Sequence, residues 1–545
     1  MSASSKKKLR AEENAAKLTE KQLSERKEAR KLRIYTIAFG VVLAVMIVAF
    51  IWVGISQTIT NAGVREKKTV ALTVGEHKIN SVEMNYFYID SINNFYSQYG
   101  SYAAMFGLDT TTPLDQQVLD EETGRTWADD FLESAQSSAQ NAYAAADAAE
   151  AAGFTLPQET QDQLDQYASN LDTYAKVYGF SDADAYLKAM YGNGASKKSY
   201  MAYYTRNVLA SAYQTEYRAG LSFTDDEIAA KDAEDSTAYN SYSYHQYYLS
   251  TSKFLSGGTT DENGSTTYSD AEKDAARIAA EAAARSLVGD DIVTVEDLDA
   301  AIAALSINAE STSAASTAYN DTPASSLAST VADWVKDSAR KAGDKTYLAS
   351  TSTTTADDGS EKTTVNGYYV VYFDSVTDNK FPLANVRHIL VQYQGGTTEN
   401  GTTTYSDEEK AAAMTAAQAI LDEWKSGDAT EDSFAALASE KTEDEGSKEN
   451  GGLYENVYPG EMVTAFNDWC FDSARKAGDT GIVETEYGCH VMYYSGDSDI
   501  TYRTYKITED LRTNAYAQWS DDLLANAAMT VGSSQYIRRD LVLSN

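Results

Sequence analysis

The chain has 545 residues and a formal net charge of −36 at pH 7, because 81 Asp and Glu residues outnumber 45 Lys and Arg residues. This length corresponds to about three or four domains, and so acidic a chain repels phosphate backbones, which argues against nucleic acid as a partner. Hydrophobic residues make up 43% and charged residues 23%, values typical of a folded protein and not of a disordered one.

The N-terminus combines a basic tail with a long apolar run. Residues 1–33 contain 11 Lys or Arg residues and 5 Glu residues, and residues 34–55 contain no charge. As a helix, the apolar run is about 33 Å long, which matches a bilayer core of about 30 Å. The sequence therefore predicts a single-pass transmembrane helix, with a cytoplasmic N-terminus and the bulk of the chain extracytoplasmic in the cell envelope. A cleaved signal peptide is the alternative, but no small-residue cleavage site follows the run.

Residues 57–235 are predicted to form a mainly helical domain. After a linker, a short strand-turn-strand leads into stretches rich in Ala, Gln, Glu, Tyr and Leu, with apolar residues spaced by three and four. We expect four or five helices between residues 114 and 235. A tyrosine stripe fits either a packed helix face or an apolar cradle for unfolded chains; its members are Tyr167, Tyr174, Tyr178, Tyr186 and Tyr191.

An internal repeat indicates two tandem modules, residues 236–380 and 381–497. GGTTDENGSTTYSDAEK from Gly257 recurs as GGTTENGTTTYSDEEK from Gly395, and DWVKDSARKAGD from Asp333 recurs as DWCFDSARKAGD from Asp468. Two matched blocks in the same order indicate a duplicated domain. Each copy is predicted to contain a strand, a glycine-rich hairpin, helices and final strands, which is an α+β plan. The remaining residues, 498–545, are expected to form a C-terminal helix that packs back on the helical domain.

Few residues in the chain offer site chemistry. The four histidines are His77, His245, His388 and His490, and the last two occupy the first and last strand-like runs of the second module. This placement lets both point into one cleft, although strand histidines that only brace the sheet are the plain alternative. Acidic turns lack the ligand spacing of an EF-hand, so no metal site is predicted. Cys470 and Cys489 are interpreted as buried apolar residues, with a disulfide between them as an open alternative.

The second module resembles the parvulin (PpiC) family of peptidyl-prolyl cis-trans isomerases. The matching stretches are VRHILV from Val386, FAALASEKTEDEGSKENGGLY from Phe434, PGEMVTAFNDWCF from Pro459 and AGDTGIVETEYGCHVMYY from Ala477. The resemblance implies a four-stranded antiparallel sheet flanked by helices, a shallow cleft on the sheet, and no cofactor. It implies catalytic roles for His388, Asp444 and His490 and a substrate-binding role for Met462, Phe466, Tyr487 and Leu453. Where the family often has Gly-Gly-Asp-Leu-Gly, residues 451–455 are Gly-Gly-Leu-Tyr-Glu.

The first module is predicted to be a degenerate and catalytically silent copy. It has His245 where the second copy has His388, but Tyr369 where the second has His490. Leu327 and Val331 stand at the positions of the pocket residues Met462 and Phe466, and no aspartate matches Asp444. We expect this copy to serve the architecture or to bind chains.

The layout of the helical region resembles surface foldases of the PrsA and SurA kind. The predicted fold class is α+β and multidomain, with an N-terminal transmembrane helix, a helical chaperone domain, two tandem parvulin-like domains and a C-terminal helix. The predicted function is a membrane-anchored foldase that isomerises X-Pro bonds in unfolded or newly secreted polypeptides, with a homodimer as a further expectation. The alternatives are a catalytically inactive holdase chaperone and a wall-associated structural protein.

Overall fold

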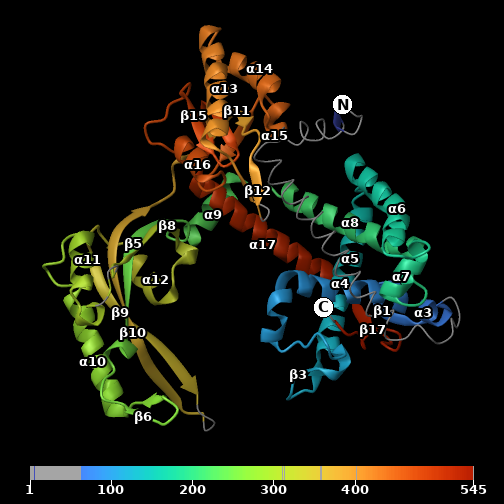
Figure 1. Ribbon diagram of the computed structural model, residues 1–545, viewed down its shortest axis with the longest axis horizontal. Helices are drawn as coiled ribbons and strands as arrows, with labels where there is room; N and C mark the ends of the chain where they lie inside the picture. The colour runs from blue at the N-terminus through green and yellow to red at the C-terminus, as the bar shows by residue number, and fades with distance from the viewer. Residues whose placement is uncertain are drawn as a thin grey trace.

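The computed structural model describes residues 5–6, 63–309, 311, 314–355, 359–399 and 402–543 (Figure 1). The predicted membrane span, residues 34–55, lies outside these residues. In the described part of the chain no helix is both long and apolar enough to cross a bilayer. The longest described helices, α5 (Trp127–Ala151) and α17 (Tyr502–Asn526), carry charged side chains along their length. The predicted fold class is therefore corrected: the structure supports a mixed α/β multidomain protein and gives no support to an N-terminal transmembrane helix.

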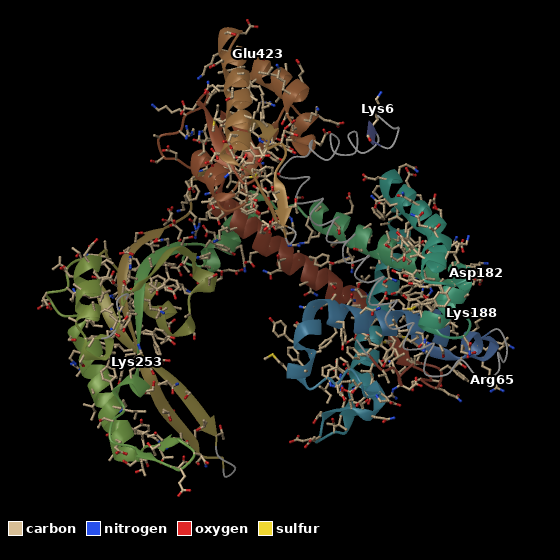
Figure 2. The ribbon with its side chains drawn as sticks, in the orientation of Figure 1. Lys6, Arg65, Asp182, Lys188, Lys253 and Glu423 are labelled. Carbon is tan, nitrogen blue, oxygen red and sulfur yellow. The ribbon has the colours of Figure 1, made fainter. Side chains whose placement is uncertain are left out.

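Three lobes make up the described chain, and Asp182, Lys253 and Glu423 mark the helical part, the first module and the second module (Figure 2). The helical part contains α3 (Val64–Lys68), β1 (Val70–Val74), β2 (His77–Asn80), α4 (Ser81–Tyr99), η1 (Gly100–Phe106), η2 (Leu114–Gln116), β3 (Val118–Asp120), β4 (Arg125–Thr126), α5, α6 (Gln158–Val177), α7 (Ala183–Tyr191), α8 (Lys197–Gly220) and α9 (Asp225–Glu234). Five helices thus follow residue 114, as expected. Capping boxes begin α5, α8 and α9, where Thr126, Ser196 and Thr224 accept from the third helical residue.

The C-terminal segment completes the core of the helical part. After α17, β17 (Met529–Val531) pairs with β1 in a sheet of order β17-β1-β2. The last described residues are not helical: Ile537, Leu541 and Leu543 are buried in the same core as Leu72 and Tyr86. Residues more than 400 positions apart therefore fold as one unit, and the expected C-terminal helix ends at Asn526.

The tyrosine stripe is mostly a packed face. Tyr186 and Tyr191 are buried in the core of the helical part, and Tyr167 and Tyr178 pack against that core. Only Tyr174 is exposed. This pattern favours the packed helix face over an open cradle at these positions.

The first module is a four-stranded antiparallel sheet of order β8-β5-β10-β9. Its elements are β5 (Ser241–Ser250), η3 (Thr251–Phe254), β6 (Thr259–Thr260), β7 (Thr266–Thr267), α10 (Asp270–Ser286), α11 (Val295–Ala303), η4 (Ser306–Asn308), β8 (Thr317–Pro323), η5 (Ala324–Ser326), α12 (Ser329–Val335), β9 (Lys345–Thr355) and β10 (Glu361–Thr377). Helices α10 and α11 share a buried core with one face of the sheet, and α12 shares a core with the other.

The second module repeats this plan with the order β14-β11-β16-β15. Its elements are β11 (Pro382–Gln392), β12 (Thr397–Glu399), β13 (Thr402–Thr404), α13 (Asp407–Ser426), α14 (Glu431–Lys441), α15 (Glu445–Lys448), β14 (Leu453–Val457), α16 (Thr464–Cys470), β15 (Thr480–Thr485) and β16 (Gly488–Thr501). Helices α13 and α14 cover one face and α16 covers the other. Cys489 belongs to the first of these cores and Cys470 to the second, on opposite faces of the sheet, and no disulfide joins them, so the disulfide alternative is wrong.

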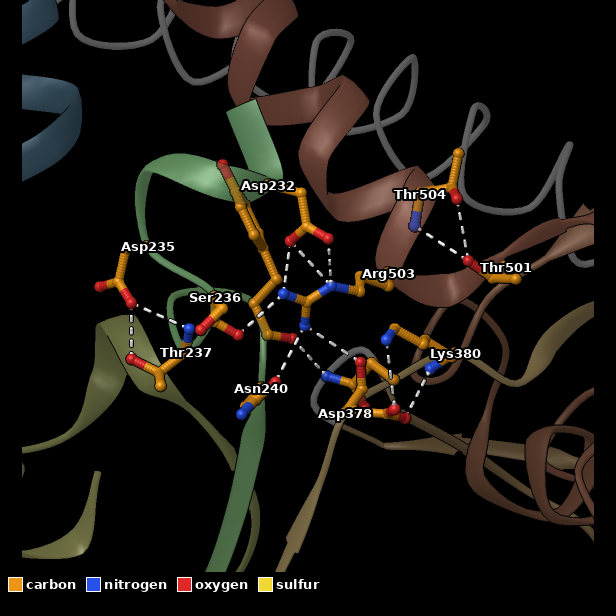
Figure 3. A network of polar contacts seen from close by, with 12 residues as sticks. Asp232, Asp235, Ser236, Thr237, Asn240, Asp378, Lys380, Thr501, Arg503 and Thr504 are labelled. Carbon is orange, nitrogen blue, oxygen red and sulfur yellow. Dashed lines mark hydrogen bonds and ion pairs between the residues drawn. The ribbon is translucent and has the colours of Figure 1, made fainter. Parts of the chain in front are cut away.

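Arg503, the second residue of α17, joins the lobes (Figure 3). Its guanidinium forms an ion pair with Asp232 of α9 and donates to the Ser236 carbonyl at 2.9 Å. It also donates to Asn240 Oδ1 at 2.9 Å and to the Asp378 carbonyl at 3.1 Å. Only 5% of the residue is exposed. One side chain therefore connects the helical part, the entry to the first module and the linker between the two modules.

Arg503→Met is expected to lower the free energy of unfolding by about 3 kcal/mol, because it leaves the partly buried Asp232 without its partner. Hydrogen exchange of residues 232–240 and 502–510 measures the opening of this junction. The matched control is Arg218→Met, since exposed Arg218 of α8 reaches Glu509 of α17 only at 4.0 Å and should contribute about 0.5 kcal/mol or less. Equal exchange rates in the two variants would contradict the role given to Arg503.

Candidate active site

Two neighbouring strands of the second module bring His388 and His490 together. His388 lies on β11 and His490 on β16, and in the register Leu390 pairs with His490 while His388 pairs with Met492. Residues two apart on a strand share a face, so the histidines are diagonal neighbours on one face of the sheet. Their Nδ1 atoms are 2.9 Å apart and their ring planes differ by 20°. Both side chains are fully buried.

Asp444 holds the other end of His388. The Nε2 of His388 makes a short contact with Asp444 Oδ2, and the same oxygen accepts from Ser447 Oγ at 2.5 Å and from the Tyr454 hydroxyl at 3.1 Å. Asp444 Oδ1 caps the short helix α15 by accepting the backbone N–H groups of Gly446 and Ser447. Burial by itself would raise the pKa of Asp444, but the hydrogen bonds from His388, Ser447 and Tyr454 hold that pKa below its usual value.

These partners determine where the protons lie. Because the ionised Asp444 accepts, His388 carries a proton on Nε2, and the Nδ1 of a neutral His388 then accepts from Nδ1–H of His490. The Nε2 of His490 is left as an acceptor, and the Thr485 hydroxyl donates to it at 2.9 Å. A single direction of donation thus runs from Thr485 through both histidines to Asp444.

Close backbone contacts hold the segments around the site, and at Gly452 they leave no room for a side chain. Thr442 Oγ1 accepts the N–H groups of Leu390 and Asp444, which attaches the segment before α15 to β11. Gly452 accepts the N–H of His388 at 2.9 Å and has a φ of +72°. A Cβ at Gly452 would lie 2.3 Å from the His388 carbonyl oxygen, so only glycine fits there.

Apolar and aromatic side chains cover the network. Phe466 of α16 is fully buried, and its ring lies edge-on to His388 and to His490, with centroid distances of 5.5 and 5.4 Å. Half-buried Met462 packs in the same cluster. Half-buried Tyr487 lies in the β15–β16 turn, where its N–H donates to Thr485 Oγ1 at 3.1 Å. The polar network is therefore shielded from solvent, and the half-buried Met462 and Tyr487 lie outside it.

Leu453 does not join the other predicted site residues. On β14, Leu453 pairs with Arg387 and Tyr454 pairs with Val386, and adjacent strand residues point to opposite faces. Tyr454 lies on the face of the histidines, with its ring centroid 5.3 Å from that of His388. The structure thus brings five of the seven predicted residues together, attaches Tyr487 to Thr485 through its backbone, and puts Tyr454 where Leu453 was expected.

Ser447, Tyr454 and Thr485 also belong to the site, although the sequence reasoning missed them. Tyr454 stands at the position of the leucine in the family's Gly-Gly-Asp-Leu-Gly pattern, which was the available signal. The other two contact the network through hydroxyls from a helix cap and a turn, for which no sequence pattern was available.

The first module lacks this arrangement, and its predicted register is wrong by one residue. Val371 pairs with Gln246 and Tyr369 with Tyr248, so Gln246 and Tyr369 stand where the second module has His388 and His490. His245 points to the opposite face, where its ring contacts Ser316 Oγ at 3.1 Å and Asp374 Oδ2 at 3.5 Å. Since strand residues alternate in direction, a shift of one residue moves the histidine away from the equivalent site.

The comparisons with known proteins agree with this geometry. Residues 371–495 match the family model described as the PPIC-type PPIase domain. The second module is a PPIC-type peptidyl-prolyl isomerase domain. The match covers less than half of the chain, so it assigns this module and not the whole protein. None of the curated proteins matches the sequence significantly.

Solved structures similar to parts of the chain include two PrsA isomerases and one isolated PPIase domain. PrsA from Bacillus cereus is 26% identical with a TM-score of 0.18, and the match covers 30% of this chain and 56% of that one. PrsA from Bacillus anthracis is 23% identical with a TM-score of 0.18, covering 27% and 59%. The PPIase domain of TbPAR42 is 25% identical with a TM-score of 0.17, covering 20% and 98%. The chain thus spans little more than half of the PrsA structures.

The PPIC-type domain is expected to lose stability as the pH falls below about 4, the ordinary pKa of an aspartate in an unfolded chain. The pKa of Asp444 is lowered on folding, so its contribution is complete above the unfolded pKa and is lost as the pH falls through the folded one. Urea unfolding of the wild type and of Asp444→Asn between pH 7 and pH 3 measures this. The difference between the two proteins should shrink as the pH falls, and a constant difference would contradict an ionised Asp444.

Proposed function

We propose that the protein is an extracytoplasmic foldase whose second module isomerises X-Pro bonds in unfolded or newly secreted polypeptides. The observation that carries the proposal is the buried His388–His490–Asp444 network beside the apolar cluster of Phe466 and Met462, in a PPIC-type domain. The extracytoplasmic location rests on the resemblance of the layout to PrsA and SurA foldases. Protease accessibility of the chain in intact cells tests that location.

The chemistry requires a site that favours a twisted amide. Rotation about a peptide bond meets a barrier of about 18–20 kcal/mol because resonance gives the C–N bond partial double-bond character. X-Pro bonds isomerise uncatalysed only in tens to hundreds of seconds. A catalyst must hold the proline ring and stabilise the charge distribution that develops as conjugation is lost. Neither task requires a covalent intermediate or a cofactor.

The residues of the second module suit these two tasks in different ways. We assign the proline ring to Met462 and Phe466, which pack in one apolar cluster over the sheet, and to Tyr487 in the β15–β16 turn. His388, His490 and Asp444 are buried, so we assign them a positioning role: they hold one pattern of donation and set the electrostatic potential beneath the substrate amide. Leu453 has no part in this proposal, and Tyr454 takes its place at the edge of the pocket.

The other regions receive roles as part of the same proposal. Residues 57–235 with residues 498–545 form the chaperone part, and residues 236–380 form a silent copy, consistent with Gln246 and Tyr369 at the positions of the two histidines. A homodimer remains a prediction. The holdase function is a second candidate for the whole chain, favoured by the exposed apolar side chains of the helical part.

His490→Ala is expected to lower the catalysed cis/trans exchange rate of a short X-Pro peptide about tenfold or more, because His388 loses the donor to its Nδ1. Exchange NMR with the full chain measures this rate. The matched control is His245→Ala in the first module, which should leave the rate unchanged since His245 faces away from the equivalent site.

Met462→Ser gives a second readout that does not disturb the buried network. It should raise KM more than it lowers kcat, because it removes apolar contact with the proline ring. If the folded wild-type protein does not accelerate the cis/trans exchange of the peptide, the isomerase proposal is wrong and the holdase function is the remaining candidate. Retained suppression of client aggregation by His490→Ala would then identify holding as the main activity.

A further inference from the structure

Two stretches of the helical part, residues 102–106 and residues 118–119, expose large apolar side chains. Tyr102, Met105 and Phe106 of η1 are 60%, 81% and 51% exposed, and Val118 and Leu119 of β3 are also exposed. Met105 is the most exposed large apolar side chain of the described residues. We call these five residues the apolar rim. Exposed apolar residues gathered in this way mark interaction surfaces.

The rim is held in one compact segment. Gln117, next to Val118, accepts the N–H of Asp109 at 2.7 Å and donates to the carbonyls of Asp109 and Thr112. Its own carbonyl accepts the N–H of Trp127. The ring of Phe106 packs on Phe95, which in turn packs on Trp127. The side chains of η1 and β3 are thereby fixed on a common support.

The fold of this segment does not require the rim to be apolar. Ala103, Leu108 and Leu114 already provide the buried anchors, and the N–H of Leu114 donates to the Leu541 carbonyl at 2.9 Å. Apart from Phe106, which packs on Phe95, the rim positions are not part of the core, so polar residues would be tolerated there. An exposed apolar surface that the fold does not require indicates a binding partner.

The surroundings of the rim are acidic. Residues 99–124 contain five acidic residues and no Lys or Arg; the acidic residues are Asp109, Asp115, Asp120, Glu121 and Glu122. The first basic residue after them, Arg125, is paired with Asp130 and Glu133 at 2.7 and 2.6 Å. A partner must therefore bring apolar side chains together with positive charge. In Figure 1 the stretch between α4 and β3 lies on the edge of the helical part that is turned toward the first module.

We propose that the apolar rim is a docking surface for extended segments of non-native polypeptide in which apolar residues alternate with Lys or Arg. This proposal rests on the foldase function and specifies which clients the helical part selects. The apolar side chains of the client cover Met105, Phe106 and Val118, and its cations lie against the carboxylates around them. Binding weakens with ionic strength because these charges are exposed to solvent.

Fluorescence anisotropy with the full chain tests the proposal. The probe is a fluorescein-labelled, proline-free peptide of alternating Leu, Phe and Lys, and a second peptide has every Lys replaced by Glu. We expect the Lys peptide to bind at least about tenfold more tightly than the Glu peptide at low salt. The double variant Met105→Ser with Phe106→Ser should lose about tenfold in affinity for the Lys peptide. Ile278 on α10 is 55% exposed, close to the 51% of Phe106. Ile278→Ser is therefore the matched control and should bind the Lys peptide as the wild type does.

Each contrary outcome has a definite meaning. No binding of the Lys peptide by the wild type, or equal binding by the double variant, overturns the proposal. A concentration-dependent dimer that the double variant loses assigns the rim to a second copy instead. A synthetic peptide of residues 1–33 is also tested as a competitor. If it displaces the probe at a lower concentration than the unlabelled probe does, the rim is assigned to the chain's own basic segment. Because the probes contain no proline, X-Pro exchange by the same protein reports separately on the isomerase proposal.

Discussion

The arrangement of the lobes depends on Arg503. Its guanidinium is nearly buried where α9, the start of β5, the linker before β11 and the start of α17 converge. A second layer supports it: Asn379 accepts the N–H of Arg503 through its carbonyl and donates its side-chain amide to the Tyr239 carbonyl and Ser241 Oγ. The planar guanidinium offers five donors at once, which a lysine at this position would not.

This junction explains how the chain combines separate modules with one continuous frame. Helix α17 leaves the junction, contacts α9 and α5, and leads to β17, which adds a strand to β1. The two modules are thus inserted between the first and last segments of a single helical part. In the proposed function, a client held by the helical part stays tethered to the same frame as the PPIC-type domain, so its encounter with that domain is intramolecular.

The central polar residues of the site in the PPIC-type domain are buried. His388, His490 and Asp444 are sealed from solvent, and their alternating donors and acceptors give one consistent proton arrangement from Thr485 to Asp444. In the first module Gln246 and Tyr369 replace the histidines, and the side-chain oxygen of Gln246 is buried without a hydrogen-bond partner in the described structure. The same fold therefore carries an ordered polar network at this position in one copy and not in the other.

The sequence alone determined the duplicated modules, the helical region and the residue types of the site, because repeats, apolar periodicity and motif spacing are local properties of the chain. Tertiary structure decided which face each strand residue occupies. His245 and Leu453 were both misplaced by one position, and one position reverses the direction of a strand side chain. Tertiary structure also decided which hydrogen-bond partners the loops and helix caps supply, such as Ser447 and Thr485. It likewise decided that the C-terminal residues return to the core of the helical part. Those contacts join residues far apart in sequence, and no local pattern encodes their distance.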